Sequence, residues 1–120
     1  MSVRHDGRQA DELRELDVQP DFLEQPHGAV LYAQGRTVVL CTATVEQDIP
    51  RWLRGKRQGW MTAEYALLPA STGERTQRGV TRGRPDGRTV EIQRLIGRSL
   101  RSVCDFKALG ERTLWLDCDV

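Results

Sequence analysis

Apolar and polar positions recur along the chain with two different periods, and each period predicts one kind of element. Stretches rich in Val, Leu, Tyr and Thr, or apolar at every second position, predict strands at residues 13–18, 28–33, 36–45, 60–68 and 113–120. A three- and four-residue period predicts one helix from Arg88 to about Phe106. With 120 residues, the chain has room for one small domain at most.

The strand predictions carry detail about pairing and burial. Gln34-Gly35 separates the second and third strands and predicts a hairpin, because glycine supplies the positive φ that a tight turn needs. Residues 38–43 are almost continuously apolar, which predicts a strand buried on both faces. Residues 13–18 predict a short edge strand. The last strand alternates, with one side carrying Leu114, Leu116, Cys118 and Val120 and the other Thr113, Trp115, Asp117 and Asp119.

The predicted helix has an apolar stripe and a charged face. The stripe consists of Ile92, Leu95, Ile96, Leu100, Val103 and Phe106. The charged face carries three arginines at positions 94, 98 and 101, with Glu91 and Asp105 beside them. We favour a solvated face with pairing between these arginines and acids over contact with RNA. Gly110 is expected to close the element.

The segment before the helix is the main candidate for binding. Residues 70–86 are rich in glycine and arginine and contain one large aliphatic residue, so we expect no order there without a ligand or a partner subunit. The helix begins at Gly87-Arg88, where unpaired backbone N–H groups and the helix dipole favour a phosphate. Arg88 adds a planar guanidinium that matches phosphate oxygens. The alternative is that Gly87 forms only a turn and that Arg88 is solvated.

Composition narrows the class of protein. The chain is 38% hydrophobic and 29% charged, which excludes wholesale disorder. No apolar run approaches the length of a membrane span, and the N-terminus lacks the apolar core of a signal peptide. Three widely spaced cysteines in apolar patterns indicate buried, reduced thiols in a cytoplasmic protein, and with two histidines they form no zinc motif.

The net charge of +1 conceals segregated charges. Acidic residues dominate positions 1–24, whereas residues 51–57 carry Arg51, Arg54, Lys56 and Arg57 without an acid. Residues 72–89 carry arginines at positions 75, 78, 82, 84 and 88. Such segregation favours a polyanionic partner, and nucleic acid is the one we favour over merely solvated loops.

Motifs for chemistry are weak when taken singly. The sequence contains no defensible nucleophile–histidine arrangement, P-loop or dinucleotide fingerprint. Asp117 and Asp119 share one face of a strand and are candidate ligands for a hard cation such as Mg²⁺. We favour a role in pairing with arginines or capping a loop.

Taken together, several segments closely resemble the bacterial ribonuclease PH family, in register across essentially the whole chain. These segments are Pro50-Arg51-Trp52-Leu53-Arg54-Gly55, residues 59–65 with Leu68-Pro69, residues 87–98, Lys107-Ala108-Leu109-Gly110-Glu111 and Leu116-Asp117-Cys118-Asp119-Val120. The resemblance implies an α+β fold of the ribonuclease PH type, with a mixed β-sheet and packed helices. It also implies that residues 1–120 are the N-terminal part of a single domain.

The implied activity is that of a phosphorolytic 3′→5′ exoribonuclease, or tRNA nucleotidyltransferase, which trims tRNA precursors with inorganic phosphate as co-substrate and releases nucleoside diphosphates. By this resemblance Arg88 binds the attacking phosphate and is the catalytic residue. Arg75 and Arg78 match arginines that guide RNA, and Arg82 and Arg84 of the same loop are assigned with them. The implied partners are RNA 3′ ends and further copies of the chain in a hexameric ring, a trimer of dimers. No membrane partner is expected.

The sequence stops within its last predicted strand, which indicates a piece of a longer protein. The resemblance implies the same. A glycine-rich segment with a Thr-Arg pair is expected after Val120, and the carboxylates that hold Mg²⁺ are expected further on, so that no metal ligand lies in residues 1–120. The alternatives to an enzyme are a non-catalytic RNA-binding ring subunit and an inactive truncated fragment.

Overall fold

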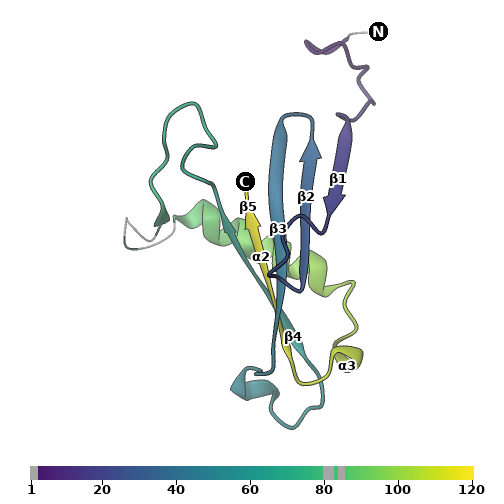
Figure 1. Ribbon diagram of the computed structural model, residues 1–120, viewed down its shortest axis with the longest axis vertical. Coiled ribbons are helices and arrows are strands. Elements are labelled where there is room, and N and C mark those ends of the chain that lie inside the picture. The colour runs from purple at the N-terminus through teal and green to yellow at the C-terminus, as the bar shows by residue number, and fades with distance from the viewer. Residues whose placement is uncertain (1–2, 80–82, 84–85) are drawn as a thin grey trace.

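The computed structural model describes residues 3–79, 83 and 86–120. Its centre is a five-stranded mixed sheet in the order β1-β2-β3-β5-β4 (Figure 1). Strand β4 runs parallel to β5, and the other neighbours are antiparallel. The elements are β1 Leu16–Pro20, β2 Gly28–Gln34, β3 Thr37–Glu46, the 3₁₀ helix η1 Arg51–Leu53, β4 Trp60–Ala66, α2 Gly87–Arg101, α3 Phe106–Leu109 and β5 Thr113–Asp119. The α+β class with a mixed sheet is confirmed.

The hairpin predicted around Gly35 is present. Gln34 pairs with Thr37 at the end of the β2–β3 ladder, and Gly35 has a φ of +61°. Strand β1 lies at the edge of the sheet, as its short alternating pattern predicted. Strand β5 lies between β3 and β4, and the register places Leu114 and Leu116 on the opposite face from Trp115 and Asp117. The expected alternation of this strand is therefore confirmed.

The predicted helix is divided in two, so its expected end at Phe106 is wrong. Helix α2 ends at Arg101, and the backbone turns through hydrogen bonds from Val103 N to Leu100 O and from Cys104 N to Arg101 O. The Asp105 carboxylate then accepts from two N–H groups and starts α3. Gly110, with a φ of +71°, closes α3 as predicted.

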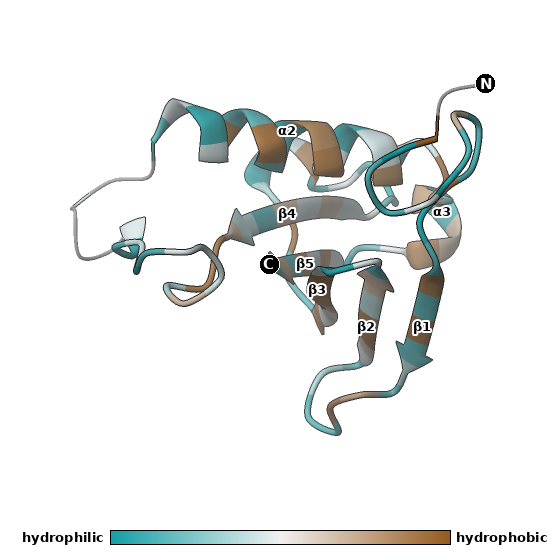
Figure 2. Cartoon of the chain, turned by 90° about the horizontal axis from the view of Figure 1, so that it is seen from above, coloured by the Kyte–Doolittle hydropathy of each residue, from teal (hydrophilic) through white to brown (hydrophobic). Residues whose placement is uncertain are grey.

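The buried core lies beside β4, because α2 packs on that strand. In Figure 2, α2 runs along β4, while β1 and β2 lie away from it. Leu53, Met61 and Ala63 are buried, with Leu53 only 1% exposed. The apolar stripe predicted for the helix is partly wrong: Leu95 is 65% exposed because it lies on the side of α2 turned away from the sheet, and Val103 is 80% exposed because the helix has already ended.

Strand β3 is central in the sheet but is not buried on both faces, contrary to the prediction. Val38 is 42% exposed, and residues 39–45 are each partly exposed. The cysteines, predicted to be buried, are also partly exposed, and all three are free thiols. For β3 and its Cys41 the reason is that α2 makes its main sheet contacts with β4 and not with β1–β3. None of the helices in this described part of the chain has the length and apolar character needed to cross a bilayer.

Candidate functional site

The start of α2 is capped by a carboxylate. Asp86 is the N-cap residue, with extended backbone, and its Oδ1 accepts from the Thr89 N–H at 2.8 Å. The Val90 N–H bonds to the Asp86 carbonyl at 3.2 Å. The expectation of a set of unpaired N–H groups at this end is therefore wrong in part, because Asp86 already occupies the Thr89 donor and places negative charge near the positive end of the dipole. An anion at this helix start must be attracted mainly by side chains.

Arg88 is the side chain at this helix start that can attract an anion. It lies in the first turn of α2, is exposed, and makes no hydrogen bond or ion pair with any residue in the described ranges. Its five N–H donors are therefore available to a ligand from solvent. A planar guanidinium can bind two phosphate oxygens at once, which fixes orientation as well as charge. The guanidinium of Arg88 is thus open to solvent at the helix start, and its role in binding phosphate stays a prediction.

A cavity of about 400 Å³ lies between the end of β4, the arginine-containing loop and the first turns of α2. It is lined by Glu64, Tyr65, Ala66, Leu67, Thr76, Gln77, Arg78, Gly79, Asp86, Thr89 and Gln93. The structure thus brings Arg78 to the helix start, whereas Arg75 and Arg88 lie outside the lining. The part of the lining that the structure describes carries both signs of charge, with the acids Glu64 and Asp86 and the base Arg78. The cavity suits a ligand that offers both hydrogen-bond donors and acceptors.

The loop that carries Arg75 and Arg78 is tied down by its own hydrogen bonds. Thr76 N donates to Pro69 O at 2.8 Å, and the hydroxyls of Thr72 and Thr76 lie 3.0 Å apart. Residues 70–79 thus contain hydrogen bonds of their own, and the expectation that this segment orders only with a ligand or a partner subunit stays a prediction. Arg75 and Arg78 are both exposed. Arg82 and Arg84, the other two arginines assigned to RNA, lie outside the described residues.

The arginines of α2 make different contacts. Arg94 lies 3.5 Å from Glu91, which confirms the predicted pairing for this residue. Arg101, expected on the solvated face with Asp105, instead donates from Nε to Gly97 O at 2.9 Å and stacks over Trp60, with 4.8 Å from its Cζ to the ring centroid. It is a structural residue that joins α2 to the start of β4.

Trp60 belongs to an aromatic cluster with Trp52 and Phe106. This cluster was not predicted from the sequence, because its members are far apart in the chain. Trp60 makes an edge contact with Trp52 at 4.9 Å between ring centroids, and its other neighbour Phe106 lies at 5.8 Å. Trp52 is 56% exposed and belongs to the basic segment 51–57. The only sequence feature that indicates the contact of Arg101 with this cluster is the spacing of Gly97 and Arg101 by four residues on one helix. That spacing lets the arginine fold back over a residue without a side chain, where an added Cβ would lie 2.5 Å from Arg101 Nη2.

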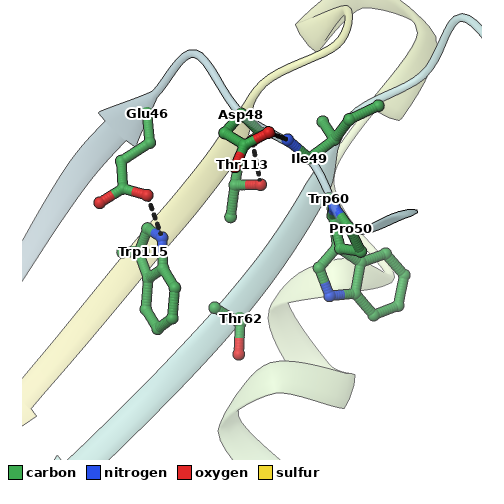
Figure 3. A pocket seen from close by; sticks show the side chains of 8 residues that line it. All are labelled: Glu46, Asp48, Ile49, Pro50, Trp60, Thr62, Thr113 and Trp115. Carbon is green, nitrogen blue, oxygen red and sulfur yellow. Dashed lines mark hydrogen bonds between the residues drawn. The ribbon is translucent and has the colours of Figure 1, made fainter. Parts of the chain in front are cut away.

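A second cavity, of about 340 Å³, lies where β3 ends and β4 and β5 begin (Figure 3). Several of its polar groups form hydrogen bonds with one another. Trp115 Nε1 donates to Glu46 Oε2 at 3.1 Å, the Thr113 hydroxyl donates to Asp48 O, and Asp48 Oδ1 accepts from Ile49 N. These bonds tie the loop after β3 to the start of β5. We therefore assign the cavity a structural role.

Asp117 and Asp119 share one face of β5, as predicted. Burial raises the pKa of the Asp117 carboxyl above its ordinary value, and the negative charge of Asp119 raises that pKa further. Burial, with Cys41 directly opposite on β3, also raises the pKa of the Cys118 thiol to about 12. Within the described ranges no three His, Cys, Asp or Glu side chains are grouped to hold a metal ion. A role of Asp117 and Asp119 in binding Mg²⁺ stays a prediction, as does the favoured role in pairing or capping.

Asp117→Asn is expected to stabilise the protein at neutral pH. A carboxyl whose pKa is raised by folding contributes stability only while it is protonated, and that stability is lost as the pH rises through the folded-state pKa. The ionised group is thus unfavourable at pH 7, and the amide removes its cost. Melting temperatures from pH 4 to pH 7 should show an advantage of the variant that grows with pH. The exposed Glu111→Gln is the control, and an advantage independent of pH would contradict this cause.

Comparison with known proteins places this chain in a family. Residues 12–120 match the model of the "3' exoribonuclease family, domain 1". Ribonuclease PH of Bacillus subtilis is 55% identical over 118 residues, which are 98% of this chain and 48% of that relative. Ribonuclease PH of Listeria innocua is 54% identical over the same shares. The chain therefore spans about half the length of the curated relatives it matches.

Solved structures agree on the fold. The crystal structure of rice Rrp46 has a TM-score of 0.76 at 21% identity and is similar over 98% of this chain and 50% of its own. An Archaeoglobus fulgidus exosome with RNA bound to its active site has the same TM-score at 22% identity, over 98% and 47% of the two chains. The resemblance seen in the sequence is thus confirmed, and the chain belongs to the 3′ exoribonuclease family.

Proposed function

We propose that the full-length protein is a phosphorolytic 3′→5′ exoribonuclease that trims the 3′ ends of tRNA precursors. The observation that carries this proposal is Arg88, whose exposed guanidinium has no partner among the described residues and lies on the first turn of α2. The similarity to ribonuclease PH over 98% of the chain supports it. Arg88 would bind inorganic phosphate, which is the attacking group.

In this reaction an oxygen of the phosphate attacks the last phosphodiester phosphorus of the RNA, and the bond from that phosphorus to the preceding 3′ oxygen breaks. The products are a nucleoside diphosphate and an RNA shorter by one nucleotide. Such transfer needs chiefly positioning and stabilisation of charge on the phosphate oxygens. The forked guanidinium of Arg88 supplies both, and it offsets the negative charge that Asp86 places at the same helix end.

The RNA would approach along the loop that carries Arg75 and Arg78. Arg78 lines the cavity beside the helix start, and Arg75 is exposed a few residues away, so the two can neutralise successive phosphates of a strand that enters the site. Arg82 and Arg84 of the same loop are proposed to act with them. Further elements of the proposal are a hexameric ring built as a trimer of dimers, a cytoplasmic location and a Mg²⁺ ion bound by residues outside 1–120.

Replacing both Arg75 and Arg78 with Ala is expected to weaken RNA binding and its dependence on salt. Each lost contact to a single-stranded phosphate should reduce the slope of log K against log salt by about 0.7. Fluorescence anisotropy with a labelled RNA in 50–300 mM salt, roughly the range in which such slopes are resolved, would measure this. Arg98→Ala, on the exposed side of α2, is the control and should leave the slope unchanged. An unchanged slope in the double variant would remove these two residues from the RNA path.

The proposed activity is tested with the full-length protein and an RNA that carries a 3′ extension. Shortening that requires added phosphate is expected. Salt-sensitive RNA binding without any shortening would instead support the alternative of a non-catalytic RNA-binding ring subunit. Absence of both binding and shortening would leave the inactive fragment.

A further inference from the structure

Helix α2 is joined to the sheet by a hydrogen bond that Gln93 accepts from a backbone N–H of β4. The Oε1 of Gln93 accepts from the backbone N–H of Tyr65 at 3.1 Å, in a partly buried position. Strand β4 is the last strand of the sheet, so an N–H that points away from β5 has no strand partner. Gln93 supplies the missing acceptor.

The position of Gln93 on the helix makes this bond a constraint on the helix start. Gln93 lies on the partly buried side of α2, close to Ile96 and the buried Gly97, whereas Arg88 is exposed. Gln93 comes five positions after Arg88, which corresponds to about 7.5 Å along the axis of a helix. Within so short a rigid element, fixing the rotation and height of one residue also fixes the other.

Apolar packing alone would hold α2 less specifically. Contacts between apolar side chains are non-directional, so they do not by themselves select one particular backbone group of β4 as a partner. A hydrogen bond to one particular backbone N–H of β4 selects one register, because it requires a donor–acceptor distance of roughly 2.7–3.2 Å and weakens steeply when the angle falls below about 120°. Gln93 also lines the cavity at the helix start together with Thr89, one turn earlier, so a shift of the helix would change the shape of that cavity.

We propose that Gln93 is a positioning residue for phosphorolysis: by holding α2 against the edge of β4, it sets the place of Arg88 in the phosphate site. This inference rests on the proposed role of Arg88. Gln93 itself touches no substrate in this account. Misplacement of a binding group by about 1 Å can cost up to 100-fold in rate, so the effect of losing the bond should be measurable.

The test uses three variants of the full-length protein. Gln93→Met keeps the length of the side chain and removes the acceptor, Gln93→Glu keeps an acceptor oxygen, and Ser99→Ala is a control on an exposed position of the same helix. We expect Gln93→Met to lower kcat/KM for phosphate by about 10–100-fold. The KM for RNA and the oligomeric mass should stay unchanged. Gln93→Glu should retain most of the phosphate efficiency, and Ser99→Ala all of it.

A double-mutant cycle separates this inference from the proposed function. If Gln93 acts through Arg88, then Gln93→Met should have no further effect on the single-turnover rate that remains in Arg88→Ala. Additive effects would overturn the inference, as would wild-type kinetics of Gln93→Met or equal losses for RNA and phosphate that follow a fall in melting temperature. A wild-type phosphate dependence of Arg88→Ala would instead overturn the proposed phosphate site.

Discussion

Arg88→Ala is expected to reduce phosphate-dependent trimming by the full-length protein by about 10²–10³-fold, the loss typical of removing one donor that stabilises transition-state charge. The structure explains why no neighbour should compensate. The Asp86 carboxylate already occupies the Thr89 N–H, and Arg78 faces a cavity that also holds two carboxylates. The guanidinium of Arg88 is thus the principal attraction for an anion among the described groups at this helix end. RNA binding should remain largely intact.

Two further variants show whether the loss of activity comes from the charge of Arg88 or from its forked geometry, and whether it is particular to this arginine. Arg88→Lys keeps the charge but not the fork, so it should recover only part of the activity if two phosphate oxygens are bound together. Arg98→Ala removes an exposed arginine from the same helix and should trim RNA as the wild type does. The measurement is the initial rate against phosphate concentration at saturating RNA. Undiminished activity of Arg88→Ala would remove this residue from the site.

Gly59→Ala is expected to be the most damaging substitution for the fold. A Cβ on Gly59 would lie 2.5 Å from Gly110 O and 2.7 Å from Arg112 O, and both are backbone atoms that cannot rotate away. The Gly59 N–H donates to Phe106 O at 2.9 Å, so the chain cannot retreat without losing that bond. Such overpacking should cost about 3 kcal/mol or more of unfolding free energy.

Gly73→Ala provides the matched control, because apart from its own chain neighbours no atom of the described residues lies within 4 Å of the position of its Cβ. Thermal unfolding of the two full-length variants should show a fall of roughly 5–10 °C for Gly59→Ala and almost none for Gly73→Ala. The cause is the fixed approach of the segment before β4 to the segment before β5. Equal melting temperatures for both variants would show that these segments separate more easily than the structure indicates.

The elements that could be predicted from the sequence are those in which local pattern and tertiary contacts agree. The hairpin at Gly35 and the alternation in β5 depend on short-range rules, and both are present. The division between α2 and α3 was missed because Val103 continues the apolar spacing of the helix, although Asp105 is a recognisable N-cap residue. Burial of β3 was overestimated because an apolar strand does not reveal which element covers it.

For the candidate site, the sequence identified the charged residues but not their surroundings. Arg88 was found from its position at a helix start, and the resemblance to ribonuclease PH supplied a role for it. The Asp86 cap, the cavity beside Arg78 and the bond from Tyr65 to Gln93 depend on how β4, the loop and α2 come together. Contacts between residues 28 positions apart have no periodic signal, so only the fold reveals them.

The most direct test of the central claim is the identity of the product released by the full-length protein. A tRNA precursor with a 3′ extension is incubated with phosphate labelled with ¹⁸O, and the released nucleotides are analysed by mass spectrometry. We predict nucleoside diphosphates that carry the label in the terminal phosphate. Release of unlabelled nucleoside monophosphates, at a rate independent of phosphate, would show that water is the attacking group and would contradict this prediction.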